Sequence, residues 1–459
     1  MTTLFLFIFW IVVLAVLASL IFNGYMLALM MCYPKPQRAK EVHTITTEDG
    51  WNIQLFRRHA GSAPGEPVLL VHSLAANRLN FEEPAGHSMA DALLAEGYDC
   101  WLLELRCCES AAPPEGRGIG DVSFDDYLFK DIPAAIAHVR QATGHDKVHW
   151  VGHSMGGMLL YAYDVAFGGE HIASGVSLGA PAGFKNLAYK PHSLLLKLTQ
   201  LAPRLVRSLI KSMGPCGQLF RPKFIGFPLD WDNVHPDVGT QMWFNIVEPV
   251  PPQVAAELDG WLSTGSWKVK GGQLDIGAKL SELTVPLLVI CGKADPFTPK
   301  PRIQEFFDAI KGKDKKLVLL SKKDGAAADY NHVDLAFGAQ SSKDVFAPAV
   351  AWIQEHPVTK AARKRAAKPK QAVAATDADS APSPQQKPKA KAAKKKGAAK
   401  PKAAPKEKAG AKKKAPAKKK APAEKKAPAK KKAPAKKTAG AKKKTSAKKK
   451  SSAKKSSAG

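Results

Sequence analysis

The last hundred residues of this chain cannot build a hydrophobic core, and this restricts folding to the part that precedes them. From residue 361 to residue 459 the sequence holds 36 Lys and Arg against four Asp and Glu, a net charge of +32. The whole chain of 459 residues carries +29, which leaves −3 on residues 1–360. The protein is therefore a nearly neutral body with a cationic tail, and its charge does not indicate a single basic nucleic-acid-binding fold.

The tail consists mainly of Ala, Lys, Pro, Ser and Gly, and the motif KKKAPA recurs at Lys412, Lys418 and Lys430. Such a composition predicts disorder, and repeated proline prevents a continuous helix. The segment resembles the tails of linker histones. We expect residues 360–459 to bind polyanions by counterion release, with nucleic acid, anionic lipid and polyphosphate as candidate partners. A solubilising tail without a partner is the alternative.

The N-terminal segment from Leu4 to Met31 contains no charged residue. About 20 apolar residues in a helix span the hydrocarbon layer of a membrane. No Lys or Arg precedes the segment, whereas Lys35, Arg38 and Lys40 follow it. Residues 1–34 are therefore predicted to be a single-pass anchor, with the body and the tail in the cytoplasm by the positive-inside rule. A cleaved signal peptide, which leads to secretion, is the alternative.

The body, residues 35–358, alternates short apolar strands with helices. This alternation predicts an α/β fold with a mostly parallel sheet covered by helices on both faces. The expected helices cover 88–96, 124–143, the segment after Ser154, and 345–355. The expected strands are two within 42–58, around a turn at Asp49-Gly50, and others at 67–72, 98–105, 148–151, 175–178, 286–291 and 317–320.

About a hundred residues separate the strand ending near Leu178 from the strand starting at Pro286, which is too long for a simple connection. We expect a helical cap at about 184–280, inserted over one edge of the sheet and including a helical stretch from His192 to Met213. Its aromatic residues either form the core of the cap or line a substrate cavity: Trp231, Trp243, Phe244, Trp261 and Trp267.

The six cysteines are too few and too irregularly spaced for a disulfide framework or a zinc site. We therefore expect reduced and mostly buried thiols, and the sequence implies no metal or cofactor.

One turn carries the chemistry. The strand Val148–Val151 leads into Gly152-His153-Ser154-Met155-Gly156, and an apolar helix follows. This is a G-x-S-x-G motif between a strand and a helix, which is typical of a nucleophile elbow. Gly152 and Gly156 remove side chains that would clash in so tight a turn. The alternative is a structural turn with an inert serine.

A serine nucleophile needs a base, and the base needs an orienting acid. In the chain order Ser, acid, His, His332 lies in a polar loop after the last strand, and Asp295 directly follows a buried strand. Asp329 and Asp334 are nearer in sequence to the histidine, but no strand end fixes them. The oxyanion needs two main-chain N–H donors, and we expect these from Met155 and Leu74.

Several segments resemble α/β-hydrolases, in particular the acid lipase branch that hydrolyses neutral lipid esters. They are TTEDGW, VHSLAANRLNF, AEGYDCWLLELR, FDDYLFKDIPAAIAHVRQATGHDKVHWVGHSMGG and DYNHVDLAFG. The resemblance covers roughly Val42 to Glu355. It implies the α/β-hydrolase fold, with Ser154 as nucleophile, Asp295 as acid, His332 as base and Leu74 as an oxyanion donor. The chain departs from the family at His72-Ser73, where His-Gly is usual, and at the Cys pair 107–108, where Gly is usual.

Together these features predict a membrane-anchored serine hydrolase that cleaves carboxylic esters of lipid type through an acyl-enzyme. The alternative is a catalytically weak or inert hydrolase-fold protein that links a membrane to nucleic acid or to a storage granule.

Overall fold

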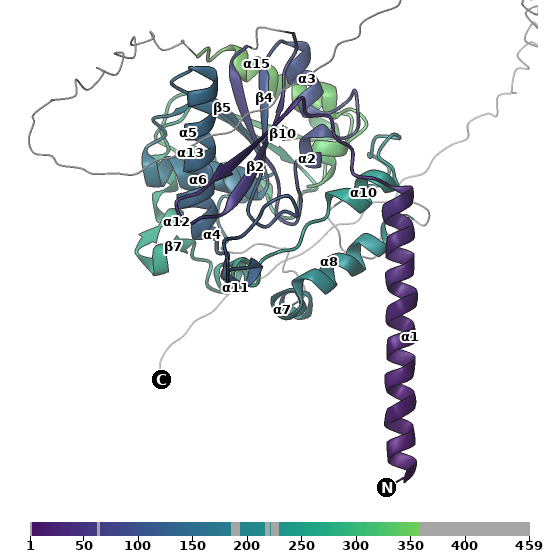
Figure 1. Ribbon diagram of the computed structural model, residues 1–459. Coiled ribbons are helices and arrows are strands. Elements are labelled where there is room, and N and C mark those ends of the chain that lie inside the picture. The colour runs from purple at the N-terminus through teal and green to yellow at the C-terminus, as the bar shows by residue number, and fades with distance from the viewer. Residues whose placement is uncertain (1, 62–64, 185–192, 216–220, 222–228, 359–459) are drawn as a thin grey trace, which may run out of the picture. The chain divides into compact units, whose positions relative to one another are not determined.

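A central sheet of eight strands organises the computed structural model, which describes residues 2–61, 65–184, 193–215, 221 and 229–358 (Figure 1). The order is β1-β2-β4-β3-β5-β6-β9-β10, and only the pairs β1–β2 and β2–β4 are antiparallel. The predicted mostly parallel sheet is thereby confirmed. Its strands are β1 (Glu41–Thr46), β2 (Asn52–Arg58), β3 (Pro67–Val71), β4 (Asp99–Glu104), β5 (Val148–His153), β6 (Ile172–Leu178), β9 (Leu287–Gly292) and β10 (Lys315–Leu320).

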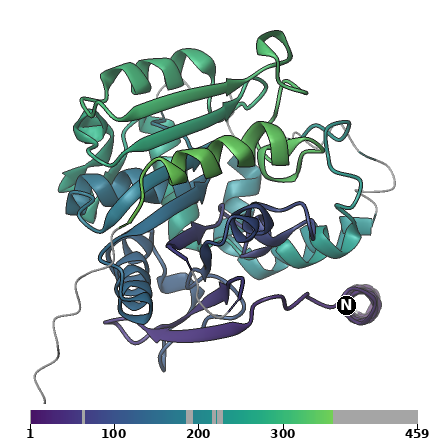
Figure 2. The ribbon, with the colours of Figure 1, turned by 90° about the horizontal axis from the view of Figure 1, so that it is seen from above.

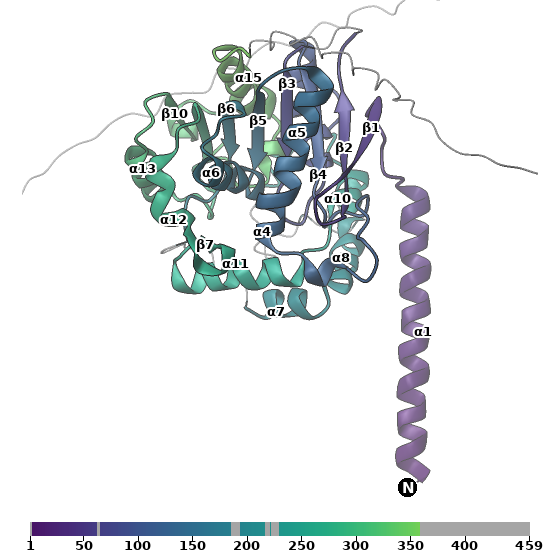
Figure 3. The same cartoon turned by 60° about the vertical axis from the view of Figure 1, so that its left-hand side comes forward.

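Helices cover both faces of the sheet (Figures 2 and 3). Leu69 and Val71 of β3 belong to one hydrophobic cluster, with the apolar residues of α5 (Ile132–Thr143), α6 (Met155–Phe167) and α13 (Lys300–Ala309). Val68 and Leu70 belong to a second cluster, with α3 (Met89–Ala95) and α15 (Ala347–Gln354). Alternate side chains of a strand point to opposite faces, so a strand that is apolar throughout must have both faces covered.

Two of the expected helical stretches differ from single α-helices. The stretch 124–143 consists of α4 (Phe124–Asp126), a π-helical turn at Tyr127–Asp131, and α5 with Pro133 in its first turn. The stretch up to Met213 consists of α7 (Ser193–Leu201) and α8 (Pro203–Ser212), which break at Ala202. Proline disfavours helical geometry in the residue before it, and Ala202, before Pro203, is indeed non-helical with a φ of −144° and a ψ of 65°. Ile132, before Pro133, keeps helical geometry, so the π-helical turn is not explained by that proline. His192 lies outside the described residues.

The insertion between β6 and β9 contains α7, α8, α10 (Thr240–Ile246), α11 (Pro252–Thr264), α12 (Ile276–Lys279) and a small ladder of β7 (Lys268–Val269) with β8 (Leu274–Asp275). The ladder was not expected, because two-residue strands leave no periodic pattern in a sequence. Phe244, Trp261 and Trp267 are buried, and the last two belong to the main hydrophobic cluster. These aromatic residues therefore form core.

The N-terminal helix α1 (Thr2–Cys32) includes a candidate membrane span of 30 residues with a mean hydropathy of 3.1. A signal sequence near the N-terminus can pass the same test of length and apolar composition. Residues 33–40, called here the connecting segment, contact the body at several points. The Asn245 side chain donates a hydrogen bond to the Tyr33 carbonyl (2.9 Å), Arg78 donates one to the Pro36 carbonyl (2.6 Å), and Lys35 forms an ion pair with the buried Glu104 (3.2 Å).

Buried thiols are confirmed for Cys100, Cys107, Cys108 and Cys291, whereas Cys32 is exposed; all five are unpaired. The predicted tail from residue 359 onwards lies outside the described residues, so the predicted domain boundaries remain predictions.

Candidate active site

Ser154 occupies a strained turn between β5 and α6. Its φ of 54° and ψ of −114° fall in a region that non-glycine residues rarely adopt. A Cβ on Gly156 would overlap the Val71 carbonyl, and a Cβ on Gly152 would overlap the main chain of Gly156. Both positions are thus limited to glycine by close main-chain approach, as G-x-S-x-G requires. The turn leaves the Ser154 side chain at the N-terminus of α6, only partly covered.

Asp295 and His332 are hydrogen-bonded to each other. Asp295 lies in the turn after β9, where its Oδ1 accepts a hydrogen bond from the Phe297 N–H (2.9 Å). Its Oδ2 lies 2.9 Å from Nδ1 of His332. Because a carboxylate only accepts, Nδ1 carries the proton, and Nε2 is left as the free basic nitrogen. Both side chains are buried.

The two carboxylates nearer to His332 in sequence have other partners. Asp329 pairs with Lys293 (2.9 Å) and accepts a hydrogen bond from the Lys322 N–H (2.7 Å). Asp334 accepts hydrogen bonds from the Asn233 side chain and the Asn331 N–H. Of the acidic residues considered from the sequence, Asp295 is the one bonded to the imidazole.

The loops after β6 and β5 bring the serine turn to this pair. The Ser154 N–H donates a hydrogen bond to the Leu178 carbonyl (2.8 Å). A Cβ on the next residue, Gly179, would lie 3.0 Å from Asp295 Oδ2 and 3.2 Å from His332 Nδ1. Among the described residues, no hydrogen bond joins the Ser154 hydroxyl to His332. Catalytic hydrogen bonds of this kind often tighten only when substrate is bound.

The two predicted oxyanion donors lie in the expected elements. Met155 is the first residue of α6, where a main-chain N–H has no partner within the helix. Leu74 lies in the loop after β3, next to Ala75 with a φ of 57°. The Ser73 N–H in this loop donates a hydrogen bond to the Asn80 side chain (2.9 Å), and His72 Nδ1 donates one to the Ser73 carbonyl (2.8 Å).

His72 can act as donor at Nδ1 because its other nitrogen accepts. Its Nε2 accepts a hydrogen bond from the Leu105 N–H (3.3 Å). Burial lowers the pKa of His72 to about 4, so the ring is neutral near pH 7 and one tautomer satisfies both contacts. The chain has Ser73 where the family usually has Gly. The loop is nevertheless held by hydrogen bonds at both the N–H and the carbonyl of Ser73.

Sequence reasoning missed His153 and Asn80. One ring nitrogen of His153 lies 3.1 Å from the His332 carbonyl and the other lies 3.0 Å from Asn80 Oδ1. The His153 and His332 rings are 5.0 Å apart. His153 therefore connects the loop of His332 with Asn80, which holds the loop after β3 through the Ser73 N–H. His153 occupies a position of the G-x-S-x-G motif at which any residue is allowed, so the motif does not predict a role for it.

Burial lowers the pKa of His153 to about 3, and the neighbouring His332 adds to the effect. The neutral ring near pH 7 has a single N–H. Since both of its partner atoms are oxygens in acceptor positions, the ring can donate to only one of them at a time.

The insertion packs against the loops that carry these residues. Ala76 and Leu79 follow the oxyanion loop, and Val333 follows the base. They form a third hydrophobic cluster with Met242 and Ile246 of α10. Part of the insertion, α10, is therefore packed against the loops that carry Leu74 and His332, and the side chains at this contact are buried.

Comparison with known proteins assigns the chain to a family. Residues 66–338 match the family described as the alpha/beta hydrolase fold. The chain belongs to the α/β-hydrolases. Its sequence is 34% identical over 122 residues to "Lipase 1" of Drosophila melanogaster, covering 25% of this chain and 27% of that protein. It is 32% identical over 130 residues to the gastric triacylglycerol lipase of Bos taurus, covering 25% and 32%.

This α/β-hydrolase thus spans about a third or less of the length of those two relatives. The solved structure of an esterase from Thermogutta terrifontis aligns over 69% of this chain and 99% of the esterase chain, with 20% sequence identity and a TM-score of 0.46. The predicted fold class is confirmed, and the relatives place the chain near the lipases.

Proposed function

We propose that this protein is a serine hydrolase that cleaves carboxylic esters through an acyl-enzyme intermediate. The observation that carries the proposal is the 2.9 Å hydrogen bond between Asp295 and His332, formed beside the strained turn of Ser154. A strained serine, an imidazole base and a carboxylate that orients its ring are the parts that activate a hydroxyl nucleophile.

In the proposed reaction, Ser154 Oγ attacks the ester carbonyl carbon while His332 Nε2 accepts the hydroxyl proton. The N–H groups of Met155 and Leu74 stabilise the oxygen that becomes negative. The C–O bond to the alcohol then breaks, and His332 returns the proton to the leaving alkoxide. A water molecule attacks the acyl-enzyme in the same way, which releases the acid and restores Ser154.

We propose lipid-type esters as the substrate class, because the relatives named above are lipases and the chain presents apolar surfaces suited to a membrane. The helices α7 and α8, with Met213 directly after them, expose large apolar side chains, called here the α7–α8 face: Leu198, Leu201, Leu205, Leu209, Ile210 and Met213. Lys197 and Arg204 are exposed beside it. The Tyr25 hydroxyl of α1 donates a hydrogen bond to the Ser212 carbonyl at the end of α8 (3.0 Å).

For the N-terminal segment we propose a single-pass anchor with the body and tail in the cytoplasm. The orienting charges include Lys35 and Arg38, which form ion pairs with Glu104 and Glu83 in the folded body. The positive-inside rule acts during insertion, before such pairs form. Secretion after signal cleavage is the competing arrangement, and the size of the mature protein distinguishes the two.

For residues 360–459 we propose binding to polyanions, because their charge is high and their composition prevents a core. Nucleic acid and anionic lipid are the main candidates. The second candidate for the whole protein is an inert link between a membrane and nucleic acid or a storage granule, which the same anchor and tail favour.

Labelling with a fluorophosphonate tests the catalytic proposal on the full chain in detergent. Peptide mapping should find the adduct on Ser154, and Ser154→Ala should lose both the label and the turnover of p-nitrophenyl esters. His332→Ala should label far more slowly, because the serine loses its base. Ser263→Ala, on the exposed surface of α11, is the matched control and should label like the native chain. Equal ester turnover by Ser154→Ala and the native chain would favour the inert link.

A further inference from the structure

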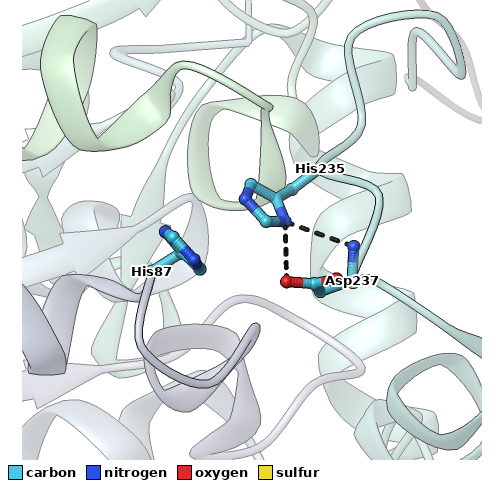
Figure 4. A group of neighbouring side chains, drawn as sticks. All are labelled: His87, His235 and Asp237. Atoms are coloured by element: carbon cyan, nitrogen blue, oxygen red, sulfur yellow. Dashed lines mark hydrogen bonds and ion pairs between the residues drawn. The ribbon is translucent and has the colours of Figure 1, made fainter. Parts of the chain in front are cut away.

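Two loops far apart in the sequence bring two histidines and a carboxylate together. His87 lies between α2 (Leu79–Glu82) and α3, and His235 and Asp237 lie just before α10 in the insertion. The ligand atoms of the three side chains lie within 4.8 Å of one another (Figure 4). None of them belongs to the proposed catalytic set, and no sequence motif connects them.

The main chain holds both loops in place. The His87 N–H donates a hydrogen bond to the Pro84 carbonyl (3.0 Å), and the next residue, Ser88, caps α3. The His235 N–H donates to the Phe337 carbonyl (2.8 Å), and the Val238 N–H donates to the His235 carbonyl (3.0 Å). The three donor side chains therefore start from fixed positions, which lowers the entropy lost on ligand binding.

The side chains themselves are arranged as neighbours. The His87 and His235 rings lie 4.4 Å apart between centroids with a tilt of 32°. Asp237 Oδ2 lies 3.8 Å from His235 Nδ1, and the Asp237 N–H donates a hydrogen bond to the same nitrogen (3.2 Å).

Two imidazoles and one carboxylate are a donor set for zinc and similar divalent transition metals. Metal–nitrogen and metal–oxygen bonds of about 2.1 Å place tetrahedral donors roughly 3.4 Å apart. His87 and Asp237 are exposed and His235 is half-buried, so rotation of the side chains can bring the ligand atoms from at most 4.8 Å apart to that spacing. Open coordination positions would be filled by water.

We propose that His87, His235 and Asp237 bind one divalent transition-metal ion, with zinc as the best match, and that the ion connects the insertion to the sheet core. Its place suggests a structural effect near the catalytic base. The Phe337 carbonyl that holds His235 belongs to α14 (Asp334–Phe337), the short helix that begins two residues after His332. The proposal does not depend on the ester hydrolase activity.

Calorimetry with zinc chloride tests the site on the full chain in detergent, after treatment with EDTA and dialysis at pH 7.5. We expect one zinc per chain and a zinc-dependent rise in melting temperature. His87→Ala and His235→Ala should each weaken zinc binding at least tenfold. Replacing a residue that only hydrogen-bonds to a metal ligand already lowers metal affinity about tenfold to a hundredfold, and these variants remove a ligand itself. Asp237→Asn should weaken zinc binding less than the histidine variants do, and should reduce the zinc-dependent rise in melting temperature. Cobalt chloride should give a visible absorption band that requires both histidines.

His171→Ala, which removes another partly exposed histidine, is the matched control and should bind zinc like the native chain. Circular dichroism checks that each variant is folded. His235→Gln, which keeps the size of the side chain, covers the case in which His235→Ala fails to fold. Zinc binding that survives in the double variant His87→Ala with His235→Ala, or no saturable binding up to 100-fold molar excess of zinc, would overturn the proposal.

Discussion

His153 has a structural position that its place in the motif does not reveal. Its ring lies between the loop of His332 and Asn80, whose side chain accepts a hydrogen bond from the Ser73 N–H. A displacement of either loop would misplace the base or an oxyanion donor. Misplacement by about 1 Å can cost roughly a hundredfold in rate, so we regard His153 as a positioning residue.

Replacement of His153 by Phe should therefore lower kcat for p-nitrophenyl esters by about tenfold to a hundredfold and leave KM nearly unchanged. Phe fills a similar volume but donates no hydrogen bond to the His332 carbonyl. Steady-state kinetics of the full chain provides the measurement.

His149→Phe is the matched control, because His149 is buried on the same strand and bonds Ser174 and Glu66 instead. It should affect stability more than kcat. His153→Gln, whose side-chain N–H can still donate, should recover part of the rate. An unchanged kcat in His153→Phe would contradict the positioning role.

Residue identity was predictable where chain order and strand ends limit the choice. Ser154 follows a strand within a motif, and Asp295 follows a strand directly, so both positions were accessible from the sequence. The hydrogen bonds of Asn80 and His153 depend on loops that meet only after folding. The same applies to His87 and Asp237, which are separated by 150 residues of chain.

At the scale of elements, α7 and α8 present the feature that most needs an explanation. Leu201 is 83% exposed and Leu205 is 56% exposed, although the cost of leaving such side chains in water is about 1.5–3 kcal/mol each. Contiguous exposed apolar surface marks a site of interaction with membranes or proteins. Basic residues beside the apolar ones match an anionic lipid surface.

Replacement of Leu205 and Leu209 by Ser should reduce hydrolysis of lipid esters in anionic vesicles about tenfold or more, since two apolar contacts with the lipid are lost. Turnover of soluble p-nitrophenyl acetate should stay the same. The ratio of the two activities is the measurement. Val42→Ser, which changes another exposed apolar residue on β1, should leave that ratio unchanged. An equal loss on both substrates would mean that the α7–α8 face supports the fold and not lipid contact.

Element types were predictable from apolar runs and their period, while element breaks were set by single residues. Pro203 divides one amphipathic stretch into α7 and α8, because Ala202 before it leaves helical geometry. The ladder β7–β8 depends on tertiary contacts, which the two-residue strands cannot encode locally.

The whole molecule combines a candidate membrane span, a folded body and a cationic extension. Only the first two lie within the described residues, and the third has a composition that excludes a core. Charge segregation therefore predicts the division into parts. The contacts between the connecting segment and the body depend on residues far apart in the sequence, so no local pattern predicts them.

Deletion of residues 360–459 should abolish DNA retardation at low salt and leave ester turnover unchanged. If roughly 10 lysines contact phosphates, log affinity of the full chain should fall with a slope of about −9 against log salt. Gel retardation over a series of salt concentrations provides the slope.

A chain of full length with the tail lysines changed to Gln separates charge from length. It should bind no better than the deleted chain. DNA binding retained by the deleted chain would show that the body, with its charge near zero, contributes the contacts.

The connecting segment, residues 33–40, has a mechanical consequence. The Tyr33 carbonyl accepts a hydrogen bond from Asn245 of α10, the Pro36 carbonyl accepts one from Arg78, and Lys35 pairs with the buried Glu104. The segment is therefore not a flexible linker between the end of α1 and the body. If α1 crosses a bilayer, the proposed catalytic residues Ser154, Asp295 and His332 are held at a set height and tilt above the lipid. Substrate would then reach them by lateral diffusion within the membrane plane, and not by a swinging motion of the body.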